Sequence, residues 1–479
     1  MVSSYHLTTF LPFLHQIVAT AIPAIPRGGL HHPEPRSSGA ELEERQSDGT
    51  GWHGYRSIGY YPNWVIYGDD TFPVTDINGK DFTHIIYAFA NVNLNSGQVF
   101  LGDDWADTQY PYPGDNPDNE SGNNLYGNLK QLFLLKKQNR NLKIQLGVGG
   151  ASYSSNFNGI INQQWRETFT TSAIDLVTDL GFEGLCLDYV RFNSAALHGL
   201  TSGAHLSFYS PNAQQTAPLV DLFRRLRIGL NSAASQIGGG HFLLSWAAAC
   251  GAQTWGNQDI PGMDQYLDYW NLMAYDFSGS WTDTALPASN LYSDGRSSDV
   301  NASGSQCLQH YISSGVDSRK LNLGLPLYGT GFTGTQGMWT PWTGTEQYNT
   351  AELPLSGDTV TYNQTLGGSW SYNPSNGRVV SFDTPTLAVQ KAIYIIQHNI
   401  GGMMYWSIDG DYSKLQPVAA SQPGNNGNKC GVPIDTDIGV SLVDTVVTAF
   451  KRYGNGLDTT QNRLSYPTSE YDNLRKGFN

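Results

Sequence analysis

The sequence predicts an α/β protein, a (β/α)8 barrel with a small α+β insertion domain after its seventh strand. Eight short apolar runs alternate with amphipathic stretches, which is the pattern of parallel strands joined by helices. The chain has 479 residues, of which 12% are aromatic and 14% charged, and this composition is typical of a packed globular protein. A stretch rich in Gly, Thr, Trp and Tyr, residues 330–383, interrupts the alternation and is expected to be the insertion.

Each apolar run is short and flanked by turn-forming or charged residues, as strands usually are. The expected strands are residues 57–61, 83–90, 143–149, 184–190, 242–248, 269–275, 321–327 and 402–407. Amphipathic periodicity predicts helices between them. The clearest of these helices are residues 124–138, 164–180, 213–235 and 384–399. Eight strands with intervening helices indicate a closed barrel, with its functional site at the carboxyl ends of the strands.

The regions outside the barrel differ from it in composition. We expect a signal peptide over residues 1–21, because an apolar run there ends in small residues, and a linker or propiece over 22–54. The barrel itself is expected over 55–415, and a C-terminal extension over 416–479. The extension carries apolar residues spaced for one helix face, which predicts a helix docked on the barrel. Those residues are Leu442, Val443, Val446, Val447 and Phe450.

Charge and glycosylation motifs bear on location and partners. The net charge of −14 argues against nucleic acid or anionic membrane as a partner, since both require basic patches. Acceptor motifs for N-glycosylation begin at Asn119, Asn301 and Asn363. No run reaches the ~18 apolar residues that a membrane span requires. The sequence therefore predicts a secreted, extracellular glycoprotein.

The four cysteines are Cys186, Cys250, Cys307 and Cys430, an even number that permits two disulfides. Cys186 falls in the middle of an expected strand, where a buried free thiol is the expected state. We therefore expect at most one bridge among the other three, with the pairing left open. No cluster of His, Cys or carboxylate residues has the spacing of metal ligands, and neither a metal nor an organic cofactor is expected.

One segment carries the clearest functional signal. Residues 181–190 read G-F-E-G-L-C-L-D-Y-V. The segment resembles the signature strand of the family 18 glycoside hydrolases, the chitinases, which reads D-G-x-D-x-D-x-E. Further segments resemble other strands of that family in the same order: residues 59–64 (GYYPNW), 87–90 (YAFA), 147–150 (GVGG), 273–281 (MAYDFSGSW), 325–329 (LPLYG) and 401–406 (GGMMYW).

The resemblance implies a mechanism in which the substrate's own N-acetyl group is the nucleophile. In that family the Glu protonates the leaving oxygen, the inner Asp steadies the intermediate, and a Tyr donates to the acetyl oxygen. Asp188 and Tyr275 match the Asp and the Tyr, and Trp406 matches the floor of the sugar site. The remaining expected substrate-binding residues are Asp276, Tyr60, Phe89, Tyr328 and Glu183, the last in place of the first Asp of the signature.

Two positions of the signature depart from the family. Val190 stands at the proton donor and Cys186 at the middle Asp. A positioned general acid contributes typically ~10²–10⁴-fold to the rate, so its loss predicts that hydrolysis is lost. A substitute acid could come from Asp276, Asp409 or Asp411 near strand ends, although none occupies the position of the missing Glu.

Three functions are compatible with these residues. The first is a secreted protein that binds chitin or N-acetylglucosamine oligosaccharides without cleaving them, which the retained Tyr275 and Trp406 favour. The second is a weakly active chitinase that hydrolyses β-1,4-linked N-acetylglucosamine polymers. The third is a barrel used as a scaffold for protein interaction. Ala151 and Thr330, where the family commonly has an aromatic residue and Arg, keep this third function open. The oligomeric state is not predicted.

Overall fold

The computed structural model describes residues 53–189, 191–192, 208–209, 211–251, 255, 257–295, 302–411 and 440–478. All of them belong to one compact unit, Trp52–Asn479. The expected signal peptide and nearly all of the expected linker lie outside the described residues. Val190, Asn301 and Cys430 also lie outside them.

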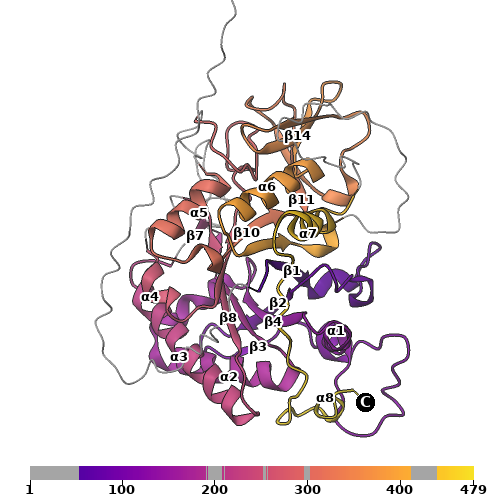
Figure 1. The fold of residues 1–479 in the computed structure, drawn as a ribbon, viewed down its shortest axis with the longest axis vertical. Helices are drawn as coiled ribbons and strands as arrows, with labels where there is room; N and C mark the ends of the chain where they lie inside the picture. Colours follow the sequence, from indigo (N-terminus) through magenta and orange to yellow (C-terminus); the bar gives the residue numbers. More distant parts are fainter. Residues whose placement is uncertain are drawn as a thin grey trace, which may run out of the picture. The chain divides into compact units, whose positions relative to one another are not determined.

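Eight parallel strands close into a barrel (Figure 1). They are β1 (Arg56–Pro62), β2 (His84–Val92), β4 (Lys143–Gly149), β5 (Gly184–Asp188), β8 (Leu243–Ala249), β9 (Tyr269–Met273), β10 (Leu321–Pro326) and β16 (Gly402–Trp406). Their order is β1-β16-β10-β9-β8-β5-β4-β2, and pairing of β1 with β2 completes the ring. A short strand, β3 (Val99–Leu101), adds antiparallel to β2. The predicted (β/α)8 barrel is thus confirmed, with each expected strand overlapping an observed one.

Helices cover the outside of the barrel (Figure 1). The α-helices are α1 (Gly127–Gln138), α2 (Gln163–Leu180), α3 (Thr216–Gln236), α4 (Ile260–Asp264), α5 (Gly304–Ser313), α6 (Pro385–Gln397), α7 (Leu442–Tyr453) and α8 (Asp472–Arg475). Local sequence sets their ends. Asn162 caps the start of α2 by accepting a hydrogen bond from the Gln164 amide, and Gly181 ends it at a φ of 81°. Short turns of other helix types include η1 (Asn63–Ile66), η3 (Trp105–Gln109) and η8 (Ile408–Gly410).

The two faces of the barrel strands enter different cores. The side chains on one face pack under the helices in a large apolar cluster. The other face fills the barrel with a second cluster, the interior cluster. Its buried members are Ile58, Tyr60, Ile86, Ala88, Phe89, Cys186, Tyr269 and Met404. Tyr61 and Tyr60 illustrate the two-residue period, because Tyr61 belongs to the outer cluster and Tyr60 to the interior cluster.

The insertion forms a five-stranded antiparallel sheet in the order β12-β11-β15-β14-β13. Its strands are β11 (Tyr328–Thr333), β12 (Gly344–Asn349), β13 (Thr359–Asn363), β14 (Gly368–Asn373) and β15 (Arg378–Ser381). A buried ion pair, 2.5 Å between Asp383 Oδ2 and Lys391 Nζ, ties the end of this sheet to α6. Ser289 donates to the other oxygen of Asp383 and so links the sheet to the loop after β9.

Cys250 and Cys307 form a disulfide that joins the end of β8 to α5. Cys186 is free and buried, as the sequence predicts.

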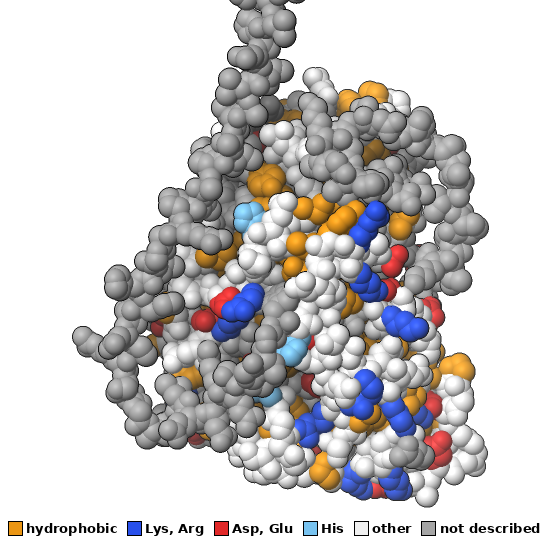
Figure 2. All heavy atoms as spheres, in the orientation of Figure 1, with side chains coloured by type: hydrophobic (Ala, Val, Ile, Leu, Met, Phe, Trp, Pro, Cys, Tyr) orange, Lys and Arg blue, Asp and Glu red, His pale blue; other side chains and the backbone are white. Residues whose placement is uncertain are grey.

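Among the described residues, no helix is long and apolar enough to cross a membrane. On the face drawn in Figure 2, Lys and Arg side chains lie interspersed with Asp and Glu.

The C-terminal segment wraps the end of the barrel at which the strands begin. Helix α7 packs on α6, and the Phe450 ring stacks on Tyr55 with centroids 4.6 Å apart. Farther along, Tyr466 donates to the Phe182 carbonyl oxygen at 2.8 Å. Beneath it, Lys136 and Glu183 form a buried ion pair with 2.5 Å between Nζ and Oε1. This pair joins α1, the start of β5 and the C-terminal segment.

We expect Lys136→Met to lower the free energy of unfolding by about 3–5 kcal/mol, because it leaves the Glu183 carboxylate buried without its cation. Urea unfolding followed by circular dichroism measures the change. The matched control is Arg319→Met. Its ion pair with Asp317 is exposed, so removal should cost at most about 1 kcal/mol. If both variants lose the same free energy of unfolding, the buried pair stabilises the fold no more than the exposed pair does, and the prediction is wrong.

Candidate functional site

Three aromatic side chains from neighbouring strands meet where the strands end. Tyr60 comes from β1, Phe89 from β2 and Trp406 from the last position of β16. Their ring centroids lie 5.3 Å apart for Tyr60 and Trp406, 5.8 Å for Phe89 and Trp406, and 6.2 Å for Tyr60 and Phe89. Trp406 is partly exposed while the other two are buried. The cluster therefore forms an aromatic floor at the carboxyl end of the barrel.

Asp188 ends β5 at the same end of the barrel and is only 5% exposed. Its Oδ1 atom has no hydrogen-bond partner among the described residues. Burial raises the pKa of the Asp188 carboxyl to about 7. An unsatisfied, buried carboxyl oxygen is costly to the fold, and such groups concentrate at functional sites.

Cys186 lies two positions before Asp188 and faces the same interior. Its Sγ is 3.4 Å from the Tyr60 hydroxyl and 3.8 Å from Asn271 Nδ2. Burial raises the pKa of the thiol to about 11, so Cys186 is neutral at physiological pH. The middle position of the signature therefore places no charge beside Asp188.

Asp276, Tyr275 and Tyr328 form a second polar group after β9 and β10. The Tyr328 hydroxyl donates to Asp276 Oδ1 at 2.5 Å, and the rings of Tyr275 and Tyr328 are 6.2 Å apart. The Tyr275 hydroxyl is 3.9 Å from Met404 Sδ in the interior cluster. Asp276 has a φ of 56°, an unusual backbone conformation of the kind that clusters at functional sites. Burial raises the pKa of its carboxyl to about 6, although the Tyr328 hydrogen bond opposes this shift.

Glycines at the end of β4 allow these groups to approach. A Cβ on Gly149, which has a φ of 115°, would lie 2.2 Å from the Asp188 carbonyl oxygen. One on Gly150 would lie 2.5 Å from the Phe89 ring. Side chains at either position would displace the floor or the end of β5.

Glu183 is not part of this site. It precedes β5, so five residues of extended chain, about 16 Å, separate it from Asp188. Its carboxylate pairs with Lys136 and accepts the Ile144 amide hydrogen at 2.7 Å. The structure thus gives Glu183 a stabilising role at the opposite end of the barrel, in place of the expected contact with substrate.

The candidate substitute acids are differently placed. Asp411 caps α7, where its carboxylate accepts hydrogen bonds from Ser441 Oγ and the Leu442 amide. Asp276 is held by Tyr328. Asp409 lies in η8 with a buried Oδ1 that has no partner among the described residues. Its charge acts on Tyr61, whose ring belongs to the outer cluster.

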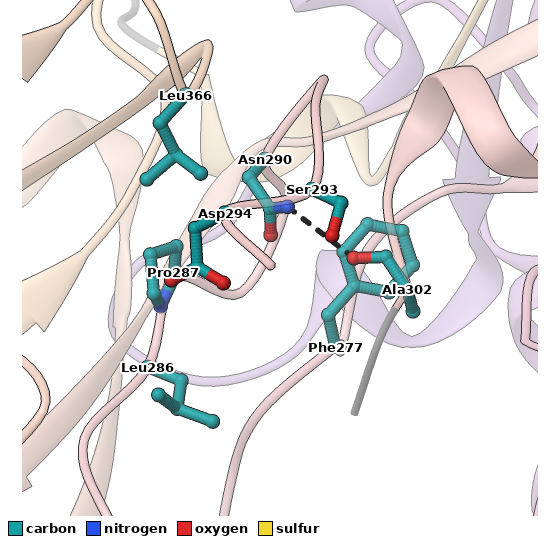
Figure 3. A pocket seen from close by; sticks show the side chains of 8 residues that line it. All are labelled: Phe277, Leu286, Pro287, Asn290, Ser293, Asp294, Ala302 and Leu366. Carbon is teal, nitrogen blue, oxygen red and sulfur yellow. Dashed lines mark hydrogen bonds between the residues drawn. The ribbon is translucent and has the colours of Figure 1, made fainter. Parts of the chain in front are cut away.

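Sequence reasoning missed Tyr153, which packs against the interior cluster. The sequence did contain a signal for it. The family commonly has an aromatic residue at the position of Ala151, and Tyr153 lies only two residues after it. A small recess lies between the loop after β9 and the insertion (Figure 3). It is lined by Phe277, Leu286, Pro287, Asn290, Ser293, Asp294, Ala302 and Leu366.

In the described part of the chain, no group of His, Cys, Asp and Glu side chains could hold a metal ion.

Comparison with known proteins identifies the family. The sequence profile of the glycosyl hydrolases family 18 matches residues 56–411, which include the whole barrel and the insertion. The chain belongs to glycosyl hydrolase family 18. Chitinase 1 of Aphanocladium album is 33% identical over 455 residues, covering 93% of this chain and 95% of that protein. Endochitinase 1 of Metarhizium robertsii is 34% identical over 439 residues, covering 89% and 92%.

Solved structures of the family share the fold. The catalytic domain of psychrophilic chitinase B from Arthrobacter TAD20 superimposes with a TM-score of 0.70 at 24% identity. The match covers 86% of this chain and 98% of that domain.

We expect Cys186 to resist alkylation by iodoacetamide at pH 8 in the folded protein. The side chain is fully buried, and its raised pKa leaves only on the order of one thiol in a thousand ionised. Peptide mapping by mass spectrometry before and after unfolding in guanidinium chloride measures the difference. Labelling of native Cys186 at the rate of an exposed thiol would contradict its placement in the barrel interior.

Proposed function

We propose that this family 18 protein is secreted and binds chitin or N-acetylglucosamine oligosaccharides, and that it has lost hydrolysis. The observation that carries the proposal is the contrast within one site. The aromatic floor and Asp188 are retained, whereas the signature has Val190 at the proton donor and Cys186 at the middle acid.

The floor suits a sugar ring. An N-acetylglucosamine ring presents apolar C–H faces and polar edges, and binding sites for such ligands combine aromatic surfaces with a few convergent polar groups. Trp406 offers a partly exposed indole. Tyr275 packs against the interior cluster and carries a hydroxyl group, and Asp188 contributes a carboxyl oxygen that has no partner among the described residues. The relatives named chitinases and endochitinases support chitin as the polymer.

The missing proton donor supports loss of hydrolysis. A glycosidic oxygen is a poor leaving group without a proton, and a valine side chain has none to give. Asp276 is bonded to Tyr328 and Asp411 to the start of α7, so both carboxyls are already engaged. None of Asp276, Asp409 and Asp411 stands two residues after Asp188 in the sequence, where the family signature has its Glu.

Three observations support secretion. The Cys250–Cys307 disulfide is of a kind that persists in oxidising compartments. The apolar run within residues 1–21 is typical of a signal peptide. The glycosylation motif at Asn119 lies in an exposed turn, as an acceptor site for a glycan requires.

We expect the protein to release no product from chitin oligosaccharides or fluorogenic chitobiosides above buffer controls at mildly acidic to neutral pH. The double variant Val190→Glu with Cys186→Asp should restore measurable release, because Asp188 and Tyr275 are retained beside the restored acid. Fluorescence of the freed leaving group and chromatography of the oligomers measure the result.

Turnover by the wild type comparable to that of an active chitinase would favour the second function, a working enzyme with a substitute acid. The single variant Cys186→Asp is the matched control, because it restores the middle carboxyl without a proton donor and should stay inactive. An inactive but folded double variant would mean that the rest of the site no longer supports the chemistry.

We expect Trp406→Ala to weaken binding of chitin tetramer roughly thirtyfold. Loss of an aromatic anchor commonly costs about 2 kcal/mol, and about 1.4 kcal/mol corresponds to a factor of ten. Isothermal titration calorimetry measures both affinities, and circular dichroism checks the fold. Tyr453→Ala is the matched control, since Tyr453 is an exposed aromatic at the end of α7. Absence of any sugar binding by the wild type would favour the scaffold function.

A further inference from the structure

Asp188 is a buried acid with no counter-charge among the side chains that the structure describes. The residue is 5% exposed, and its Oδ1 atom has no partner among the described residues. Its backbone carbonyl is satisfied, because it accepts the Gly150 amide hydrogen at 2.8 Å. The side chain is therefore the unsatisfied part of the residue.

The described titratable groups that face Asp188 are neutral or acidic. They are Tyr60 from β1, Cys186 from β5 itself and Tyr275 after β9, with Asp276 next to Tyr275. Burial raises the pKa of both tyrosines well above 10, so they stay protonated at neutral pH. On β4, the residue paired with Asp188 is Gly149, which adds no charge. No side chain within 53–189 or 211–251 supplies a cation that would stabilise an ionised carboxylate here, and the raised pKa of the Asp188 carboxyl comes from burial.

Resting on the function proposed above, we propose that the sugar site is proton-linked: binding of a chitin oligosaccharide drives uptake of a proton by Asp188, and affinity is therefore higher on the acid side of neutrality. A neutral sugar laid on the aromatic floor would remove water from the small part of Asp188 that is still exposed. It brings no positive charge in exchange. Desolvation without a counter-charge favours the neutral acid.

The direction of the pH dependence follows from linkage. In the free protein, burial already places the pKa of Asp188 at about 7, and bound sugar raises it further. Well below pH 7 the carboxyl is protonated in both states, so the affinity is at its maximum. Above pH 7 binding must take up a proton, so the affinity falls as the pH rises. At high pH the total loss approaches roughly tenfold for each unit by which bound sugar raises the pKa of Asp188.

Calorimetric titration of the full chain with chitin tetramer at pH 5.5 and pH 8.5 tests the proposal. We expect at least threefold tighter binding at pH 5.5. At pH 7.5, titrations in two buffers of different ionisation enthalpy should report uptake of roughly half a proton per site for a one-unit rise in pKa. Asp188→Asn resembles the protonated acid in shape and charge, so it should bind equally at both pH values and take up no proton.

Two further variants identify the titrating group. Asp179→Asn is the matched control, because burial also raises the pKa of Asp179, to about 6, but it lies at the end of α2 near the start of β5. This variant should keep the wild-type pH dependence. Asp276→Asn should also keep it, although its affinity can change. Loss of the dependence in Asp276→Asn and its persistence in Asp188→Asn would overturn the assignment to Asp188.

A measurement without ligand separates this inference from the proposed function. The raised pKa means that ionising Asp188 destabilises the folded state, so wild type should lose thermal stability relative to Asp188→Asn as pH rises from 5.5 to 8.5. A constant difference between the two melting temperatures would overturn the inference. So would sugar binding of equal strength at both pH values. If the tetramer binds at neither pH, the proposed function is overturned, and the inference with it.

Discussion

Closure of the parallel sheet is the constraint on which the site depends. Strand β1 pairs with β16 on one side and β2 on the other, with Gly59 opposite both Tyr405 and Ile85. This register sets the ends of the three strands side by side, so that rings from distant parts of the sequence meet as one floor. The same two-residue period that directs Tyr60 into the barrel directs Tyr61 under the helices. A slip of one residue in β1 would exchange these side chains and remove the floor.

The sequence predicted the strands better than the helices, for a physical reason. A barrel strand is buried on both faces, so it appears as a short apolar run with clear boundaries, and all eight runs were found. Helix α4 spans only five residues, too few to show a period. Helix α5 is short and rich in polar residues, although Ser303 caps its start and accepts from the Gln306 amide. The pairing of Cys250 with Cys307 depends on how β8 and α5 pack, which no local pattern encodes.

Within the site, residues at strand ends were predictable and the partners of their polar atoms were not. The motifs predicted Tyr60, Phe89 and Trp406 as site residues, and the structure brings their rings together from three neighbouring strands. Glu183 shows the limit of matching residues to a motif by type alone. It precedes β5, which runs from Gly184 to Asp188. It is also two residues before Leu185, so its side chain points to the same face as that residue of the outer cluster. The two-residue period therefore directs it away from the barrel interior, toward Lys136.

Cys186 places a neutral group two residues before Asp188 in the barrel interior. A carboxyl there would stand two residues from Asp188 on the same face, and two acids in so little solvent cannot both ionise without a large penalty. Catalytic sites tolerate that penalty because the coupling moves protons during turnover. With a neutral thiol at position 186, the coupling and its penalty are both removed, and the titration of Asp188 follows from its own burial. The described site combines three aromatic rings with a buried acid at the end of β5, and this combination supports the proposed binding of a sugar without its cleavage.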